Sequence, residues 1–179
     1  MKEQKKILGE DRRNLILQIL FNRKEPITGG ELAALANVSR QVIVGDITLL
    51  KAKNEPILAT SQGYLYLPSP SRAHMFEQII ACYHSTNKTE DELNLLVDHG
   101  VTVKDVKVEH PVYGDITASI MVSNRREVQL FMKKVRLTNA AYLADLTDGF
   151  HLHSITAPTQ RALNEASKAM KEANYLLDI

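Results

Sequence analysis

Two histidines separated by one residue, His151 and His153, are the feature of this sequence that most constrains its fold. Alternate side chains of an extended strand project to the same face, so a strand here would point both imidazoles in one direction. Such a strand can offer two ligands to one metal ion, whereas a hydrophobic strand gains little from two imidazoles on one face. The spacing alone leaves open whether the pair binds a metal or is an ordinary pair of strand histidines.

The histidines are distributed unevenly along the 179 residues. The first seventy residues contain none, and the six are His74, His84, His99, His110, His151 and His153. Between the two parts, Pro68-Ser69-Pro70-Ser71 has the composition of a short, stiff linker. Because a chain of 179 residues can form two small domains, we expect one domain over residues 1–68 and another over residues 72–179.

The first domain is expected to begin with three helices. Apolar residues at helical spacing predict a first helix through residues 15–20, with Asp11 as its cap. Thr28 and Glu31 have the spacing of a capping box, which begins a second helix. Ser39 is expected to cap a third helix that runs to about residue 51. The residues expected to face inward from it are Val42, Ile43, Ile47 and Leu50.

A β-hairpin is expected after these helices. Residues 56–60 and 64–67 have the composition of two strands, and residues 61–63 that of a three-residue turn ending in glycine. Asn37 suits a left-handed turn between the second and third helices. This order of elements is that of a winged helix-turn-helix, in which the third helix enters the major groove of DNA.

Several side chains of this domain are candidates for contact with DNA. Arginine can bind guanine and glutamine can bind adenine, so Arg40 and Gln41 could read bases. A phosphate contact for Arg40 and a solvated surface position for Gln41 remain open. Lys51, Lys53 and Tyr64 are better suited to the DNA backbone. The candidate DNA-binding residues are therefore Ser39, Arg40, Gln41, Lys51, Lys53 and Tyr64.

The second domain is expected to belong to the α+β class, as an open-faced antiparallel β-sandwich with helices on one face. The element order is βαββαβα, which favours such a sheet. Strands are expected at residues 74–84, 101–109 and 116–122, followed by a strand pair spanning 142–146 and 150–156 and a further edge segment at 175–177. Helices are expected at residues 89–99, 125–136 and 159–171.

The histidine pair has candidate partners in this domain. His84 ends the first expected strand, and Glu92 lies one turn into the following helix. If the strand of His151 and His153 neighbours the first strand, three histidines and one carboxylate meet. Nitrogen and oxygen ligands suit zinc, nickel, iron or manganese. Neither an HExxH nor a CxxC motif occurs, and Cys82, the single cysteine, is expected to be a small buried apolar residue.

Charge and hydropathy narrow the choice of partners. Residues 1–67 carry ten basic and seven acidic side chains, whereas residues 68–179 carry twelve and fourteen. A mildly basic first domain suits a polyanion. No apolar run is long enough to cross a membrane, and residues 1–6 lack the apolar stretch of a signal peptide. A single cysteine fits a reducing compartment, so we expect a cytoplasmic protein without a membrane partner.

Three segments give the chain a family resemblance. They are Ser39-Arg40-Gln41-Val42-Ile43-Val44-Gly45-Asp46-Ile47, Val108-Glu109-His110-Pro111-Val112-Tyr113-Gly114 and Asp148-Gly149-Phe150-His151-Leu152-His153-Ser154-Ile155. With these segments the chain resembles, over nearly its full length, the niacin-responsive transcriptional repressors of bacteria. That family joins a winged helix to a ligand-binding domain named for three histidines.

The resemblance implies a function and a set of site residues. The metal ligands would be His84, Glu92, His151 and His153, around a divalent transition metal. The protein would repress genes of NAD synthesis or niacin uptake, with nicotinic acid as co-repressor and operator DNA bound by a homodimer. The resemblance does not identify other residues that hold the co-repressor, although His110 and Tyr113 are neighbours worth testing. Gly45 lies within the expected recognition helix, where a glycine is about 1 kcal/mol less favourable for helix formation than an alanine.

The sequence leaves room for functions of other classes. A metalloenzyme with an accessory DNA-binding domain could use the metal to activate water. We find no general base or nucleophile with a defined partner, and therefore expect no enzyme. Two further possibilities are a metal-responsive repressor, in which the ion is itself the signal, and a dimerisation domain with incidental histidines.

Overall fold

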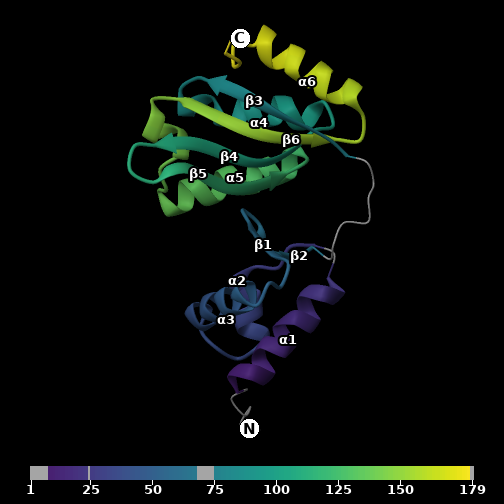
Figure 1. Ribbon diagram of the computed structural model, residues 1–179, viewed down its shortest axis with the longest axis vertical. Coiled ribbons are helices and arrows are strands. Elements are labelled where there is room, and N and C mark those ends of the chain that lie inside the picture. The colour runs from purple at the N-terminus through teal and green to yellow at the C-terminus, as the bar shows by residue number, and fades with distance from the viewer. Residues whose placement is uncertain (1–7, 24, 68–74, 178–179) are drawn as a thin grey trace. The chain divides into compact units, whose positions relative to one another are not determined.

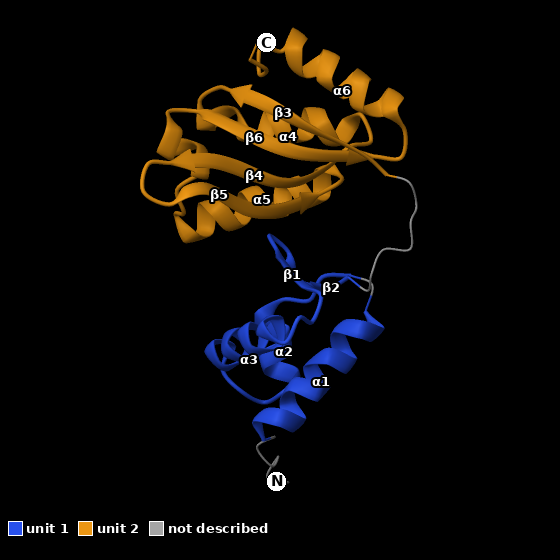
Figure 2. Cartoon of the chain, in the orientation of Figure 1, with its two compact units in different colours: residues 1–71 blue, residues 72–179 orange. Residues whose placement is uncertain are grey.

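The structure is a computed structural model that describes residues 8–23, 25–67 and 75–177. The chain divides into two compact units, residues 1–71 and residues 72–179 (Figure 2). The expected linker at residues 68–71 and His74 lie outside the described residues. Among the helices that are described, none combines the length and apolar character needed to cross a membrane.

The first unit is a winged helix-turn-helix, as the sequence predicts. Its elements are α1 (Gly9–Asn22), α2 (Gly29–Leu35), α3 (Arg40–Ala52), β1 (Ile57–Thr60) and β2 (Gly63–Tyr66). The core lies between the three helices and the hairpin, where Ile16, Leu32 and Ile43 are fully buried. The hairpin is tied to the segment before α2 because Ile27 and Tyr64 exchange backbone hydrogen bonds of 2.9 and 2.8 Å.

Local signals in this unit are confirmed at the second and third helices. Thr28 and Glu31 form the expected capping box. Asn37 adopts a left-handed φ of 52°. The Ser39 hydroxyl accepts a hydrogen bond of 3.4 Å from the amide of Val42. These caps fix where α2 and α3 begin.

Three expectations for this unit are wrong in detail. Helix α1 begins at Gly9, so Asp11 lies in its first turn and is not its cap. Val42 is 37% exposed, whereas Asp46, one turn further along α3, is buried together with Ile43 and Ile47. The hairpin turn is shorter than expected, since Gly63 already pairs with Thr60 as part of β2.

The second unit is an antiparallel sheet with helices on one face. Its elements are β3 (Phe76–Tyr83), η1 (Thr86–Lys88), α4 (Thr89–Asp98), β4 (Thr102–His110), β5 (Gly114–Val122), α5 (Arg125–Thr138), η2 (Leu143–Thr147), β6 (Phe150–Ala157) and α6 (Gln160–Glu172). The strand order is β3-β6-β4-β5 (Figure 1). The core lies between the sheet and the three α-helices, where Leu93, Val128 and Leu163 are fully buried.

One expected strand of this unit is wrong. Residues 142–146 are expected to form one strand of a pair, but Leu143–Thr147 is a 3-10 helix. The backbone amide of Tyr142 donates a hydrogen bond of 3.0 Å to the carboxylate of Asp145, which favours a tight turn over extension. Asp148 then takes a left-handed φ of 51°, which ends the turn before β6.

The register of β3 against β6 sets up the candidate site. Cys82 pairs with His151 and Ile80 with His153, in an antiparallel ladder. The expected edge segment is present in part, as Leu176 forms an isolated bridge with Cys82 on the other side of β3. The strand that carries the histidine pair therefore lies directly beside the strand that ends near His84.

Candidate metal centre and DNA-binding surface

The structure brings together the four residues that the sequence proposes as metal ligands. His84 follows β3, Glu92 lies in the first turn of α4, and His151 and His153 project from β6. The Nε2 atom of His84 is 3.0 Å from Glu92 Oε2. The Nε2 atoms of His151 and His153 are 3.2 and 3.4 Å from Glu92 Oε1. Three imidazoles thus converge on one carboxylate.

This cluster is almost wholly removed from water. The side chains of His84, Glu92, His151 and His153 are 6, 1, 3 and 3% exposed. Burial alone would raise the pKa of Glu92, but the charge of His153 and the proximity of the three histidines lower that pKa well below its ordinary value. Burial lowers the pKa of His153, and the Glu92 charge overrides this effect and raises it.

Backbone carbonyls fix which ring nitrogen of each histidine faces the cluster. The Nδ1 atoms of His84, His151 and His153 lie 3.1, 2.9 and 2.6 Å from the carbonyl oxygens of Ser85, Gly149 and Asp105. A carbonyl oxygen can only accept, so each Nδ1 carries a proton. Each Nε2 is therefore free to present its lone pair to the centre. This arrangement is typical of histidines that ligate metals.

The three histidine Nε2 atoms and the Glu92 carboxylate oxygens that face one another are suitable ligands for a cation. Although His84 Nε2 lies 3.0 Å from Glu92 Oε2, it makes no hydrogen bond of acceptable geometry with any described residue. If all three imidazoles were doubly protonated, three buried positive charges would face one carboxylate, which is costly. One divalent ion would satisfy three neutral imidazoles and the carboxylate together. The buried cluster could therefore hold a metal ion.

Cys82 is a member of this cluster that the sequence analysis does not identify. Its sulfur, a Glu92 carboxylate oxygen and a His151 ring nitrogen all lie within 4.8 Å of one another. A signal is present in the spacing, because Cys82 precedes His84 by two residues on the same strand face. Only the β3–β6 register shows that this face meets His151.

Gly149 allows the two histidine-bearing segments to approach closely. Its φ is 97°, and a Cβ at this position would lie 2.4 Å from the carbonyl oxygen of His84. The amide of Gly149 donates to the carbonyl of Ala144 over 2.9 Å, which holds the start of β6 against η2. A glycine is therefore required where β6 enters the site.

A small cavity of about 210 Å³ borders the cluster. Glu92, His151 and His153 form one wall of this cavity. The other lining residues are mostly apolar, and come from β4, β5, α5 and the segment around η2: Val106, Ala118, Ile120, Phe131, Val135, Ala140, Ala141, Tyr142, Leu143 and Ala144, with Thr89 and Ser119. Within the described part of the chain, no lysine or arginine lines it.

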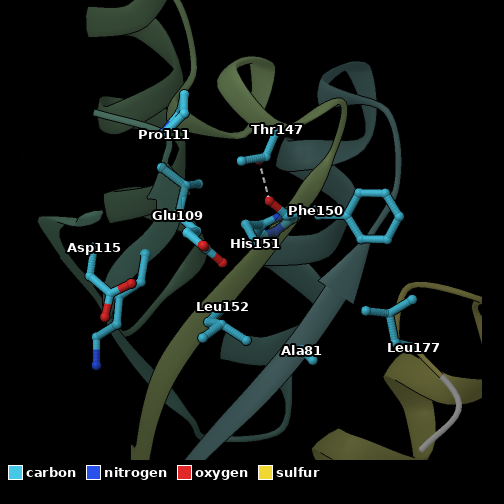
Figure 3. A pocket seen from close by; sticks show the side chains of 11 residues that line it. Ala81, Glu109, Pro111, Asp115, Thr147, Phe150, His151, Leu152 and Leu177 are labelled. Carbon is cyan, nitrogen blue, oxygen red and sulfur yellow. Dashed lines mark hydrogen bonds between the residues drawn. The ribbon is translucent and has the colours of Figure 1, made fainter. Parts of the chain in front are cut away.

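A second, wider cavity of about 550 Å³ lies mainly on the sheet face that carries no helices. Figure 3 shows Phe150, Leu152 and Leu177 near Ala81 at one side of it and Glu109 near Asp115 at the other. The Thr147 hydroxyl donates to the carbonyl of Phe150 at its rim. Of the four candidate ligands only His151 lines this cavity, whereas Glu92, His151 and His153 line the smaller one.

His110 and Tyr113 line neither cavity. They lie in the β4–β5 hairpin, where His110 Nδ1 accepts hydrogen bonds of 3.1 and 3.3 Å from the amides of Val112 and Tyr113. The rings of His110 and Tyr113 are 4.9 Å apart. His110 therefore makes structural hydrogen bonds within the hairpin.

The candidate DNA-binding residues lie along α3 and the hairpin. Arg40 and Gln41 are exposed in the first turn of α3, directly after Ser39, which caps the helix. A Cβ placed on Gly29 would lie 3.5 Å from Arg40 and 3.4 Å from the Tyr64 ring, so both side chains flank Gly29.

Two lysines complete the candidate set but lie apart from it. Lys51 and Lys53 are exposed at the opposite end of α3, which begins at Arg40 and ends at Ala52. A helix of this length separates its ends by roughly 18 Å. The basic residues therefore mark two places along the recognition helix, not a single patch.

Comparisons with known proteins agree with this architecture. Residues 77–179 match the 3H domain, and residues 12–65 match an HTH domain. The chain is 57% identical over 178 residues to the transcription repressor NadR of Bacillus subtilis (strain 168), covering 99% of both chains. It is 35% identical over 173 residues to the probable transcription repressor NiaR of Thermotoga maritima, covering 97% of both.

These relatives are named as repressors that regulate transcription, and the helix-turn-helix implies operator DNA as partner. A regulatory role is therefore favoured over an enzymatic one. The chain belongs to the 3H-domain family of helix-turn-helix transcription repressors that includes NadR and NiaR.

Proposed function

We propose that this repressor acts on genes of NAD synthesis or niacin uptake and uses nicotinic acid as its co-repressor, sensed at a metal ion in the 3H domain. One observation carries the proposal. Three imidazole Nε2 atoms and the Glu92 carboxylate converge at the wall of a cavity of about 210 Å³ that no lysine or arginine of the described residues lines.

His84, Glu92, His151 and His153 would hold the ion. Their nitrogen and oxygen atoms suit nickel, zinc, iron or manganese. Bound there, the ion would supply a Lewis-acid site for the pyridine nitrogen or the carboxylate of nicotinate. The carbonyls of Ser85, Gly149 and Asp105 keep the imidazoles turned toward the ion.

The cavity suits a small aromatic acid. Pockets for drug-sized ligands measure about 300–1,000 Å³, so a cavity of about 210 Å³ fits a single-ring compound better than a dinucleotide. Phe131 and Tyr142 supply aromatic surface for the ring. Since no lysine or arginine from the described part of the chain lines the cavity, a bound carboxylate would depend on the metal for charge compensation.

The winged helix would bind the operator through α3. Ser39, Arg40 and Gln41 would meet the major groove at the start of the helix, while Lys51, Lys53 and Tyr64 would contact the DNA backbone. A homodimer would present two such helices to two half-sites. The co-repressor would then act by favouring one placement of the two winged helices.

Elemental analysis and DNA titrations test this function. The purified chain should contain about one metal ion per chain, and nicotinate should raise its affinity for DNA upstream of NAD-synthesis genes. Nicotinamide, which lacks the negative charge, is the matched control and should have a much smaller effect. Coupling must be reciprocal, so operator DNA should raise nicotinate affinity by the same factor.

The same titrations separate a metal-responsive repressor, which the buried cluster also supports. If the ion is the signal, metal alone will restore full operator affinity to chelator-treated protein, and nicotinate will add nothing. That outcome would reject nicotinic acid as co-repressor while keeping the metal centre. A metal-free protein that still responds to nicotinate would reject the metal as part of the sensor.

A further inference from the structure

Cys82 lies against the candidate metal centre on a side that does not border the 210 Å³ cavity. Its side chain is fully buried, and its strand partner is His151. Glu92, His151 and His153 line the cavity, but Cys82 and His84 do not. The thiol therefore lies beside the metal centre but outside the lining of the cavity where a small ligand would bind.

The Cys82 thiol lies next to the Glu92 carboxylate, whose orientation decides whether it faces all three imidazoles. Glu92 must direct Oε2 toward His84 and Oε1 toward His151 and His153 at the same time. A carboxylate can only accept hydrogen bonds, whereas a thiol can donate one. The Cys82 sulfur lies within 4.8 Å of a Glu92 carboxylate oxygen and of a His151 ring nitrogen.

A further observation concerns the ligand atom that this carboxylate faces. His84 Nε2 is buried and without a hydrogen-bond partner among the described residues, although it points at the carboxylate that Cys82 contacts. The Glu92 carboxylate thus lies between the Cys82 thiol and the unpaired Nε2 atom of His84.

We propose that Cys82 is a positioning residue of the metal centre, whose thiol donates to Glu92 and holds the carboxylate toward the three imidazoles. The inference rests on the proposed function only in requiring that the centre bind a metal. Groups that hydrogen-bond to metal ligands orient them, and their loss commonly weakens metal binding by about 10–100-fold.

The competing explanation is that Cys82 only fills space in the core. A packing role and a positioning role predict opposite effects for serine and alanine in place of Cys82. Serine keeps a donor but brings a hydroxyl into an apolar core, whereas alanine removes the donor and remains apolar. If Cys82 only fills space, Cys82→Ser should be the more harmful change. If it positions Glu92, Cys82→Ser should rescue what Cys82→Ala loses.

The experiment measures nickel and zinc affinity of the full chain by competition with a chromophoric chelator. Cys82→Ala should bind the metal about 10–100-fold more weakly than wild type. Cys82→Ser should retain most of the affinity. Val103→Ala, a fully buried β4 position in the same core, is the control for lost packing and should lower stability with little change in metal affinity.

A spectroscopic reading separates a positioning thiol from a ligating thiolate. The cobalt-loaded wild type should lack the near-ultraviolet thiolate-to-cobalt charge-transfer band. Such a band, abolished in Cys82→Ser, would overturn the positioning role and make Cys82 a ligand. Equal metal affinity in Cys82→Ala and wild type would also overturn it, while leaving the proposed function intact. A wild type that binds no metal would overturn both.

Discussion

Asp46 of the recognition helix α3 is bound by Arg12 of helix α1, across 34 residues of sequence. Arg12 Nε and Nη2 lie 2.5 and 3.2 Å from the two carboxylate oxygens. Arg13 adds a longer contact of 3.5 Å to the same carboxylate. The side chains of Arg12 and Asp46 are only 11 and 4% exposed, so this pair joins the two helices from inside the unit.

Replacing Asp46 with alanine should therefore destabilise the first unit. Removing one member of a buried ion pair leaves the other charge unpaired, and we expect a loss of about 3 kcal/mol. Urea unfolding followed by hydrogen exchange, which assigns the transition to residues of the first unit, measures this loss. Thr48→Ala, at an exposed position of the same helix, is the control and should change stability by less than about 0.5 kcal/mol. Equal effects would contradict the role given to the pair.

The two ends of α3 should respond differently when DNA contacts are removed. Gln41→Ala should reduce discrimination at one base pair of the operator by about 1–3 kcal/mol, because a base contact is lost. Lys51→Ala should weaken binding to all sequences alike and reduce the salt dependence by about one counterion. Titrations of singly substituted operators at several salt concentrations distinguish the two. A uniform loss for Gln41→Ala would assign Gln41 to the backbone instead.

Much of this architecture follows from local sequence signals. The capping box at Thr28 and Glu31, the left-handed Asn37 and the period-two histidines each depend on residues a few positions apart. Local physical chemistry decides such features, and the structure agrees with them. The order of most strands and helices in the second unit is predictable for the same reason.

The errors arise where a distant partner or a local turn decides the outcome. Asp46 is buried because Arg12 pairs with it, a contact that helical periodicity does not reveal. In the sequence Cys82 resembles any buried cysteine, because only the register of β3 against β6 places it beside His151. Residues 142–146 are expected to form a strand, but the side chain of Asp145 closes a turn there.

Removing the metal proposed for the 3H domain should destabilise the second unit and leave the first unit unchanged. A ligand that binds only the folded state adds about 2.7 kcal/mol when present at one hundred times its dissociation constant. Thermal melts with and without a chelator, with each transition assigned by hydrogen exchange, measure the difference. Glu92→Gln, which removes the charge at the centre, should melt at the same temperature in both conditions. A chelator effect that persists in this variant would place the stabilising ion elsewhere.

Gly149 and Gly100 offer a matched test of how closely β6 must approach His84. Both have a positive φ, 97° and 73°, so an alanine costs about 1–2 kcal/mol of backbone strain at either position. At Gly100 nothing lies within 4 Å of an added Cβ, whereas at Gly149 the His84 carbonyl oxygen would be only 2.4 Å away. Gly149→Ala should therefore lose more stability than Gly100→Ala and should also displace His84, weakening metal binding by about tenfold or more. Chelator competition and urea unfolding of both variants measure the two effects. Equal losses, with metal affinity intact in Gly149→Ala, would show that the close approach of Gly149 to His84 does not position the ligand.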